Sequence, residues 1–300
     1  MTKTTKWVLG GIGTLFVLFV LFWGAILFFI FQGDDDEEYS TGSGGTIAVV
    51  ELKQEIVSSE SIVRQFKKYR ENSSVKGIVF RVESPGGGVA ASQEIYEEVK
   101  KTRESGKPVV VSMGAVAASG GYYVSCGASK IMANPGTVTG SIGVISQFMN
   151  FNQLMGKIGV GSTTVKSGKF KDTGNPYREM TEEEKKYFQE TIDDVYQQFL
   201  LVVETERKLS HDAAKRLADG RIFTGRKAFA AGLVDTLGTY EDAVSLAAHL
   251  ARLSGTPKII KERKRERLAD ILFGSIAHEI VDLKQDIMNQ PMLQYKLTQP

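Results

Sequence analysis

The first pattern in the chain is a continuous apolar run. Residues 7–31 contain no charged residue. At about 1.5 Å per residue, a helix of this length reaches roughly 37 Å and can cross a hydrocarbon core of about 30 Å. The run ends in FFIFQGDDD, which lacks the small residues of a signal-peptide cleavage site. We therefore expect a transmembrane helix over residues 7–31 that contacts membrane lipid.

Charges on the two sides of this run predict its orientation. Lys3 and Lys6 precede it, and consecutive acidic residues at 34–38 follow it. Because positive charge favours the cytoplasmic side, residues 1–6 are expected in the cytoplasm and the rest of the chain outside. Residues 32–45 are polar and rich in glycine, which predicts a flexible linker with solvated acidic side chains. Together these features predict a single-pass protein of the cell membrane with an extracytoplasmic domain.

From residue 46 onward, short β-branched runs alternate with helical periods. The strand-like runs are residues 47–52, 77–82 and 108–113, and the helical segments are residues 59–70, 90–104 and 181–208. Strands separated by helices of this length imply βαβ crossovers. The sequence therefore predicts an α/β domain over residues 46–250.

The tail, residues 251–300, carries weaker signals. Its basic run KERKRER at 261–267 is most simply a solvated face, and contact with anionic lipid or a partner is the alternative. The later segment ILFGSIAHEIVDL at 271–283 has the pattern of an amphipathic helix. We expect this helix to serve packing or assembly.

Composition excludes several classes of protein. The 300 residues are 42% hydrophobic and 24% charged, which excludes a disordered or collagen-like chain, and a net charge of +2 provides no basic field for nucleic acid. Cys126 is the single cysteine, so an internal disulfide is excluded, and its apolar context predicts burial. His278 and Glu279 begin like a zinc-peptidase motif, but Asp282 stands where the second histidine belongs. We expect no metal and no other cofactor.

A glycine-rich segment, SPGGG at residues 84–88, follows the predicted strand 77–82 and precedes a helix. Glycines at such a position let backbone N–H groups approach a ligand closely. A plain strand-to-helix turn explains the segment equally well. A phosphate loop is excluded, because no Gly-Lys-Ser/Thr follows.

A single serine, Ser119, lies among small residues in the segment GAVAASGGYY at 114–123, directly after the predicted strand 108–113. A tight turn there would hold the hydroxyl at a helix N-terminus, where free N–H groups can stabilise an oxyanion. Ser119 is thus a candidate nucleophile, and an ordinary helix N-cap is the alternative. The segment departs from the GxSxG pattern, because Ala117 replaces the first glycine.

A nucleophilic serine needs a base, and the histidines are poor candidates. His211, His249 and His278 all fall in helical segments of the C-terminal third. Lysine can replace histidine in this role when burial favours its neutral form. The segment KSGKFKD at 166–172, which follows the strand-like stretch GSTTV, offers three lysines. The residues alone do not select among Lys166, Lys169 and Lys171, and all three could simply be solvated.

Five segments in the same order resemble the SppA family of signal peptide peptidases, in its half-length, membrane-anchored form. They are SPGGG at 84–88, AASGGYY at 117–123, TGSIGV at 139–144, KSGKFKD at 166–172 and DGRIFTGRKAFAAGLVDTLG at 219–238. The resemblance implies a ClpP/crotonase-like fold and a ring-like homo-oligomer. It also implies a membrane-anchored serine endopeptidase that degrades cleaved signal peptides and other apolar peptides.

The resemblance further implies roles for particular residues. Ser119 would be the nucleophile, Lys171 the general base, and Ser141 a hydrogen-bond partner of the lysine amine. Gly86 or Gly87, together with the Gly120 amide, would form the oxyanion hole. In double-length relatives the serine and the lysine lie in different halves of the chain, so a half-length chain would share each site between neighbouring subunits.

Two other functions remain open from the sequence. A crotonase-type acyl-CoA enzyme would use the same fold and the same pair of amides, but an export anchor would separate it from its cytoplasmic cofactor. A non-catalytic membrane scaffold would need neither the serine nor the lysine. The sequence does not specify the preferred substrate side chains, the ring size, or whether intact proteins are cut.

Overall fold

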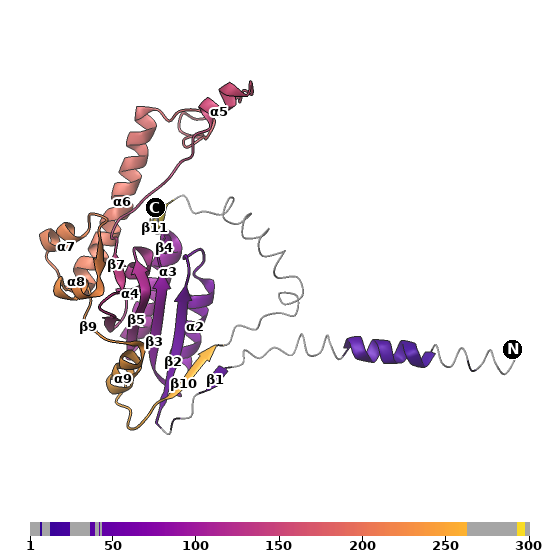
Figure 1. Cartoon of the computed structure of the whole chain (residues 1–300), viewed down its shortest axis with the longest axis vertical. Coiled ribbons are helices and arrows are strands. Elements are labelled where there is room, and N and C mark those ends of the chain that lie inside the picture. The colour runs from indigo at the N-terminus through magenta and orange to yellow at the C-terminus, as the bar shows by residue number, and fades with distance from the viewer. Residues whose placement is uncertain are drawn as a thin grey trace.

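A largely parallel β-sheet forms the centre of the domain in the computed structural model, which describes residues 7, 13–24, 37–39, 42, 44–262 and 293–297. The described strands follow the order β1-β10-β2-β3-β5-β6-β9, in which only the β1–β10 pair is antiparallel. Their bounds are β1 Glu37–Tyr39, β2 Thr46–Lys53, β3 Val75–Ser84, β5 Val109–Ala118, β6 Lys130–Ala133, β9 Thr236–Leu237 and β10 Lys258–Glu262. The structure thus confirms the predicted α/β class (Figure 1).

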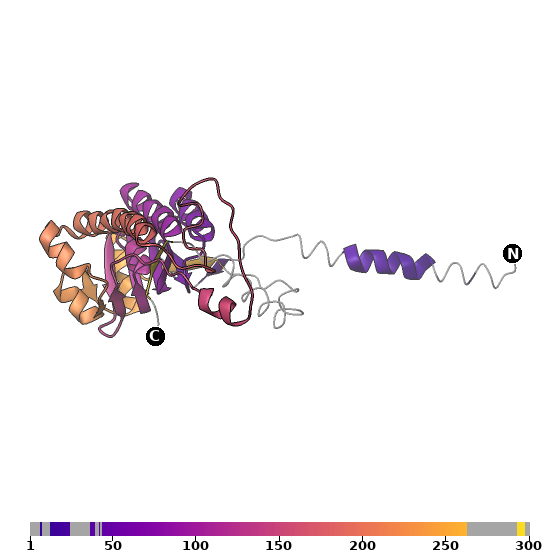
Figure 2. The same cartoon turned by 90° about the horizontal axis from the view of Figure 1, so that it is seen from above.

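Helices cover both faces of this sheet, which explains the uninterrupted apolar runs of its strands. Helices α2 (Glu60–Glu71) and α3 (Val89–Glu104) pack on the face that carries Phe80, and α9 (Tyr240–Leu250) packs on the face that carries Val79. Successive strand residues point to opposite faces, so these neighbours enter different cores. Figure 2 shows α2 and α3 side by side along one face.

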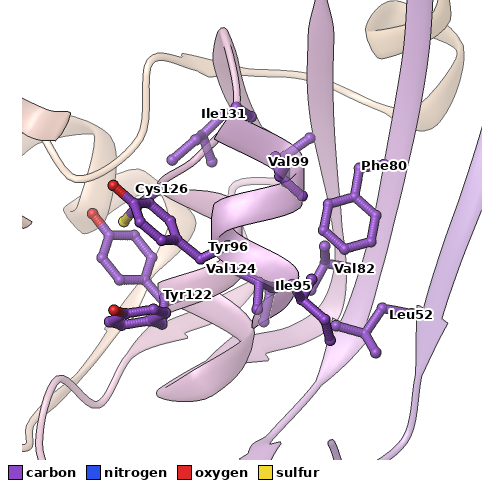
Figure 3. Packing of buried hydrophobic residues seen from close by; sticks show 14 of the residues in the cluster. Leu52, Phe80, Val82, Ile95, Tyr96, Val99, Tyr122, Val124, Cys126 and Ile131 are labelled. Atoms are coloured by element: carbon purple, nitrogen blue, oxygen red, sulfur yellow. The ribbon is translucent and has the colours of Figure 1, made fainter. Parts of the chain in front are cut away.

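The larger core surrounds a short helix, α4 (Gly120–Ser125), all of whose residues are buried. Figure 3 shows Tyr122, Val124 and Cys126 packed among residues of α3 and the strands. The Tyr122 hydroxyl donates to the Leu233 carbonyl at 2.9 Å. Cys126 is buried as expected, and this burial raises the pKa of its thiol to about 12.

Strand β5 is longer than the predicted strand 108–113, because it continues to Ala118. Its last residues, 116–118, pair with β7 (Val138–Gly140), and β7 pairs in turn with β8 (Ile222–Thr224). The small side chains at 114–118 had indicated a turn. Backbone pairing with a strand about 20 residues further along the chain overrides that local signal.

A projection from the domain contains the lysine-rich segment. We call residues 146–181 the arm; they include α5 (Asn152–Lys157) and lead into the long helix α6 (Glu182–Arg207) (Figure 1). The strand-like interpretation of GSTTV at 161–165 was wrong, since these residues form an exposed loop. Two short helices follow α6: α7 (His211–Leu217) and α8 (Gly225–Ala230).

Both ends of the chain contribute strands to the domain. β1 lies within the predicted linker 32–45, and β10 and β11 (Gln294–Lys296) lie within the predicted tail 251–300. β11 pairs antiparallel with β4 (Gly86–Gly88) in a second, two-stranded sheet. Most of the basic run and all of the predicted amphipathic helix, residues 263–292, lie outside the described residues.

Only part of the predicted membrane span falls within the described residues. Residues 13–24 are helical and exposed. No helix in the described parts of the chain is both long enough and apolar enough to cross a membrane. Residues 1–6, 8–12 and 25–31 lie outside the described residues.

Candidate active site

Ser119 occupies a strained turn between β5 and α4. Its backbone has φ 53° and ψ −115°, a region that residues other than glycine seldom adopt. Two hydrogen bonds hold the turn: the Ser119 amide donates to the Gly140 carbonyl at 2.7 Å, and the Ser119 carbonyl accepts from the Tyr123 amide at 2.8 Å. The fully buried α4 fixes the other side of the turn.

The hydroxyl of Ser119 does not cap the helix that it precedes. No side-chain capping bond forms at α4, and the Oγ atom is buried without a hydrogen-bond partner among the described residues. Ser119 thus occupies the N-cap position of α4 but is not an ordinary N-cap, because its side chain makes no capping bond. A buried hydroxyl without a partner costs free energy, as does the positive φ, and strain of this kind is concentrated at functional sites.

The glycine segment forms a strand, β4, rather than a plain turn. Ile56 pairs with one edge of it: the Ile56 amide donates to the Gly86 carbonyl at 2.8 Å, and the Gly88 amide donates to the Ile56 carbonyl at 2.8 Å. Because backbone groups alternate in direction along a strand, the N–H of Gly87 points to the opposite edge. The Gly86 amide is instead directed to the Ser84 hydroxyl at 3.2 Å.

Only glycine fits at two positions of this strand, Gly86 and Gly87. A Cβ atom on Gly87 would lie 2.3 Å from the Ile56 carbonyl oxygen, and one on Gly86 would lie 2.7 Å from the Gly120 amide nitrogen. Both glycines also have positive φ values, 103° at Gly86 and 156° at Gly87. β4 and the N-terminus of α4 therefore lie next to each other. Gly86, Gly87 and Gly120 surround a small recess beside Ser119, which we call the notch.

Ser141 lies next to Ser119 because of strand register. Ala118 pairs with Gly140 in the parallel β5–β7 ladder, so Ser119 and Ser141 are the residues that follow at the same edge of the sheet. Ser141 is 8% exposed, and its amide donates to the Arg221 carbonyl at 2.8 Å. A cavity of about 440 Å³ beside it is also lined by Asp193 and Asp219.

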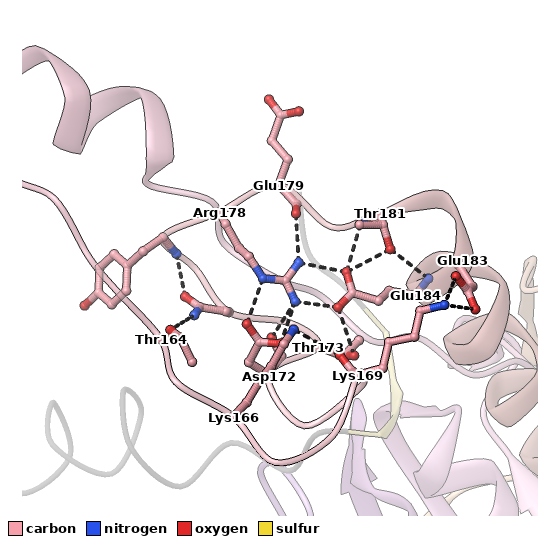
Figure 4. Close-up of polar contacts among 12 residues, drawn as sticks. Thr164, Lys166, Lys169, Asp172, Thr173, Arg178, Glu179, Thr181, Glu183 and Glu184 are labelled. Carbon is pink, nitrogen blue, oxygen red and sulfur yellow. Dashed lines mark hydrogen bonds and ion pairs between the residues drawn. The ribbon is translucent and has the colours of Figure 1, made fainter.

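The lysine segment is held on the arm by ion pairs (Figure 4). The Arg178 guanidinium donates to both carboxylate oxygens of Asp172 at 2.9 Å and to Glu184 at 2.8 Å. These contacts hold the pKa of Glu184 at about 2 and that of Asp172 well below its usual range. Lys166 also pairs with Asp172.

The three lysines of this segment differ in their partners. Lys169 pairs with Glu183 at 2.5 Å, and Lys166 with Asp172. Lys171 is exposed, and its amine makes no hydrogen bond or ion pair to the described residues. Lys171 is thus the lysine of the three whose amine is not engaged by a carboxylate.

Within one chain the structure does not bring Lys171 to Ser119. Arg178 ties the lysine segment to Glu184, near the N-terminus of α6. Helix α6 contacts the α4 region further along, at Phe199, whose ring packs on Tyr123 with a centroid distance of 5.0 Å. Fifteen residues of helix separate these points, which corresponds to about 22 Å. Ser119, Ser141 and the three glycines form one cluster, and Lys171 lies outside it.

The histidines lie away from this cluster. His211 begins α7, where its Nδ1 atom contacts Glu204 at 2.8 Å, and His249 is exposed in the last turn of α9. His278 is outside the described residues. Among the residues that the structure describes, no three His, Cys, Asp or Glu side chains gather as a metal site requires.

Comparison with known proteins assigns the chain to families of peptidases. Residues 101–254 match peptidase family S49, and residues 46–139 match the Clp protease family. A Synechocystis sp. protein provisionally named a protease is 44% identical over 72% of this chain and 78% of its own length. An Enterococcus faecium protein provisionally named signal peptide peptidase SppA is 42% identical over 64% of this chain and 56% of its own length. Protease 4 of Haemophilus influenzae is 38% identical over 69% of this chain and 33% of its own length.

These matches and the fold define a serine peptidase with a ClpP-like domain. The matched segments include the strand that leads to Ser119, the helix that follows it and the lysine segment. The chain belongs to peptidase family S49, the family of SppA. The family resemblance of the sequence motifs is thereby confirmed.

Proposed function

We propose that this chain is a membrane-anchored endopeptidase with a serine–lysine dyad. Ser119 attacks the peptide carbonyl while the neutral amine of Lys171 takes its proton, and Ser141 orients that amine. The amides of Gly87 and Gly120 stabilise the oxyanion. Water then hydrolyses the acyl-enzyme.

The observation that carries this proposal is the state of Ser119. Its strained backbone and its buried, unpartnered hydroxyl lie beside a notch formed by glycine residues. The direction of the amides supports Gly87 over Gly86, since the Gly86 amide is directed to Ser84. A crotonase-type acyl-CoA enzyme would use the same pair of amides but would not need the strained serine, and a scaffold would need neither.

The distance between Lys171 and Ser119 supports a site shared between neighbouring subunits of a ring. The arm that carries Lys171 exposes apolar side chains: Met149 is 72% exposed, Leu154 56% and Ile158 62%. A neighbouring subunit would cover such a surface. The cavity beside Ser141 leaves space for a lysine supplied by a neighbour.

The proposed substrates are signal peptides left in the membrane after preprotein cleavage, together with other apolar peptides. One relative carries the name signal peptide peptidase, and the uncharged run at 7–31 would hold the domain at the membrane surface where such peptides remain. The domain would lie on the extracytoplasmic side, with residues 1–6 in the cytoplasm.

A serine-directed fluorophosphonate tests the nucleophile. Mass spectrometry of the treated protein should locate the label on Ser119, and Ser119→Ala should remove it without loss of cooperative unfolding. A label on another serine, with Ser119 unmodified, would refute the assignment.

Mixed rings test the sharing of the site. Ser119→Ala and Lys171→Ala proteins, each inactive, should recover about a quarter of wild-type activity after unfolding and reassembly in equal amounts, because one interface in four combines both intact residues. No recovery, with mixed rings seen by native mass spectrometry, would place both residues in one subunit.

A further inference from the structure

One serine of the glycine-rich segment, Ser84, has no part in the proposed chemistry but lies against both sides of the notch. It is the last residue of β3, and it pairs with Ala117 of β5 in the parallel ladder. Its side chain is fully buried. The sheet therefore holds Ser84 in a fixed position, next to glycines that have no side chains of their own to restrain them.

The hydroxyl of Ser84 contacts both backbone polar groups of Gly86. The Gly86 amide donates to the Ser84 Oγ atom at 3.2 Å, and this Oγ atom donates more weakly to the Gly86 carbonyl at 3.4 Å. A hydroxyl has one proton and two lone pairs, so it can make both contacts at once. The Gly86 carbonyl also accepts from the Ile56 amide at 2.8 Å. The two peptide groups that meet at Gly86 are thus both held.

The second of these peptide groups carries a proposed oxyanion donor. The Gly86 carbonyl and the Gly87 N–H belong to one planar trans peptide group, in which they point in opposite directions. Ser84 and Ile56 hold the carbonyl on one side of β4. The Gly87 N–H is thereby directed to the other side, where the notch lies.

The glycines of β4 have little preference of their own for this orientation. Gly86 and Gly87 have φ values of 103° and 156°, and glycine reaches many other conformations at little cost. Loss of the Ser84 hydroxyl would leave the buried Gly86 amide without its acceptor, which favours rotation of the peptide groups towards another partner. Such a rotation would turn the Gly87 N–H away from the notch.

The backbone of Ser84 supports the other side of the notch. Its carbonyl oxygen lies 2.7 Å from the position of a Cβ atom on Gly121, so the first turn of α4 packs directly against it. The Gly120 amide, the second proposed donor, belongs to the preceding residue of the same turn. Ser84 thus contacts both segments that supply the oxyanion donors.

We propose that Ser84 is a positioning residue of the oxyanion hole, whose hydroxyl directs the Gly87 N–H at the carbonyl under attack. The proposal rests on the proposed peptidase function, because the oxyanion arises only when Ser119 adds to a peptide carbonyl. Ser84 acts through the glycine and exchanges no proton with the substrate. It therefore affects the chemical step and leaves binding of the substrate in the ground state unchanged.

Peptide hydrolysis by Ser84→Ala, measured on the full-length protein in detergent, tests the proposal. We expect kcat to fall about 10–100-fold and KM to stay within about threefold of the wild type, a smaller loss than removal of a donor causes, because the Gly87 amide is still present. The inhibition constant of a peptide aldehyde should rise by the same factor, since its adduct with Ser119 places an oxygen in the notch. The pH midpoint of kcat/KM should not move, because Lys171 is unchanged.

Ser125→Ala is the matched control for the loss of a buried hydroxyl. Ser125 is equally buried, and its hydroxyl donates to the Gly121 carbonyl at 2.7 Å within α4. Both substitutions should lower Tm, Ser84→Ala by more, because it leaves the Gly86 amide without an acceptor. At a temperature where both proteins are folded, Ser125→Ala should keep kcat within about threefold of the wild type. Equal losses of kcat in the two variants would reduce Ser84 to a structural role and refute the proposal.

Ser84→Cys keeps the test decisive if Ser84→Ala does not fold. The substitution nearly preserves the shape of the side chain, but a thiol is a weaker donor and acceptor than a hydroxyl. Its kcat should therefore fall by at least about fivefold with KM unchanged. A Ser84→Cys protein with the kcat of the wild type would refute the proposal.

Fluorophosphonate labelling of the same samples separates the two proposals. If the wild type hydrolyses peptides and is labelled on Ser119, but the Ser84 variants keep kcat and aldehyde inhibition within about threefold, the role of Ser84 is refuted and the peptidase function stands. A shifted pH midpoint also refutes it, because Ser84 would then act on the base. If the wild type neither hydrolyses peptides nor is labelled, the peptidase function fails, and the role of Ser84 fails with it.

Discussion

Replacing Gly86 by alanine tests whether the glycine notch beside Ser119 is the catalytic feature. The added methyl group would lie 2.7 Å from the Gly120 amide nitrogen and 1.9 Å from the carbonyl oxygen of Tyr295 in β11. It would therefore block the position that a substrate carbonyl must reach. The substitution also adds backbone strain, because Gly86 has φ +103°.

Gly106→Ala is the matched control that separates strain from blockage. Gly106 also has a positive φ, +86°, but no atom lies within 4 Å of its added Cβ. Gly106→Ala should lose about 1–2 kcal/mol of folding stability through strain, or about 2–8 °C in Tm for a domain of this size, and Gly86→Ala should lose more, because its Cβ also overlaps backbone atoms. Gly86→Ala should in addition lose the contribution of an oxyanion donor, about 2.7–4 kcal/mol, which corresponds to roughly 10²–10³-fold in kcat.

The assay combines hydrolysis of a fluorogenic peptide with thermal unfolding of the two variants. We expect a larger Tm decrease for Gly86→Ala than for Gly106→Ala and, at a temperature where both variants are folded, a large loss of kcat for Gly86→Ala alone. A Gly86→Ala protein that unfolds like Gly106→Ala and keeps activity within about threefold of the wild type would refute the role of the notch. If Gly86→Ala does not fold, Gly120→Ala repeats the test without a positive φ, because its Cβ would lie 3.1 Å from the same oxygen.

The remaining predictions concern the lysine segment and the ion pairs that hold it. Lys171→Arg should be inactive although it keeps the charge, because arginine does not deprotonate. The activity of the wild type should rise from neutral to alkaline pH, and peptide hydrolysis measures both effects. Arg178→Ala should lower kcat about tenfold or more and leave KM unchanged, because it releases the segment that carries Lys171. The free energy of unfolding should change by less than about 1 kcal/mol, and Arg178→Lys should restore part of kcat. The ion pair with Arg178 lowers the pKa of Glu184 from 4.5 to about 2. Its contribution to the stability of the arm is therefore complete above pH 4.5 and is lost as the pH falls towards 2. Cleavage of the arm by pepsin should increase across that interval.

The sheet could be predicted from the sequence because its strands are buried on both faces. Continuous β-branched runs such as 77–82 allow few other structures. The structure contains the predicted strands 47–52, 77–82 and 108–113 and the predicted helices 59–70, 90–104 and 181–208, each within about five residues at its ends, whereas the strand-like stretch 161–165 is a loop. The lengthening of β5 to Ala118 could not be predicted, because it depends on pairing with β7. Small residues carry no local signal for such a partner.

The site was only partly visible in the sequence for the same reason. Ser119 stood out as a single serine among small residues, but its nearness to Ser141 follows from the register of two strands, which no local pattern specifies. The aromatic contact between Tyr123 and Phe199 beside the site was missed altogether. Tyr123 was quoted only as part of a motif, and Phe199 lies in a helix whose apolar spacing indicated nothing beyond packing.

The strained residues of the site share one structural cause. Ser119 and Ser141 both have positive φ, 53° and 51°, and each follows the last paired residue of a parallel strand. At that edge the chain must turn sharply, and hydrogen bonds from the two amides to Gly140 and Arg221 hold the turns. A glycine would relieve the strain at either position but would remove the hydroxyl. The two positions thus keep a conformation that local preferences oppose, which is expected where the side chain serves chemistry rather than folding.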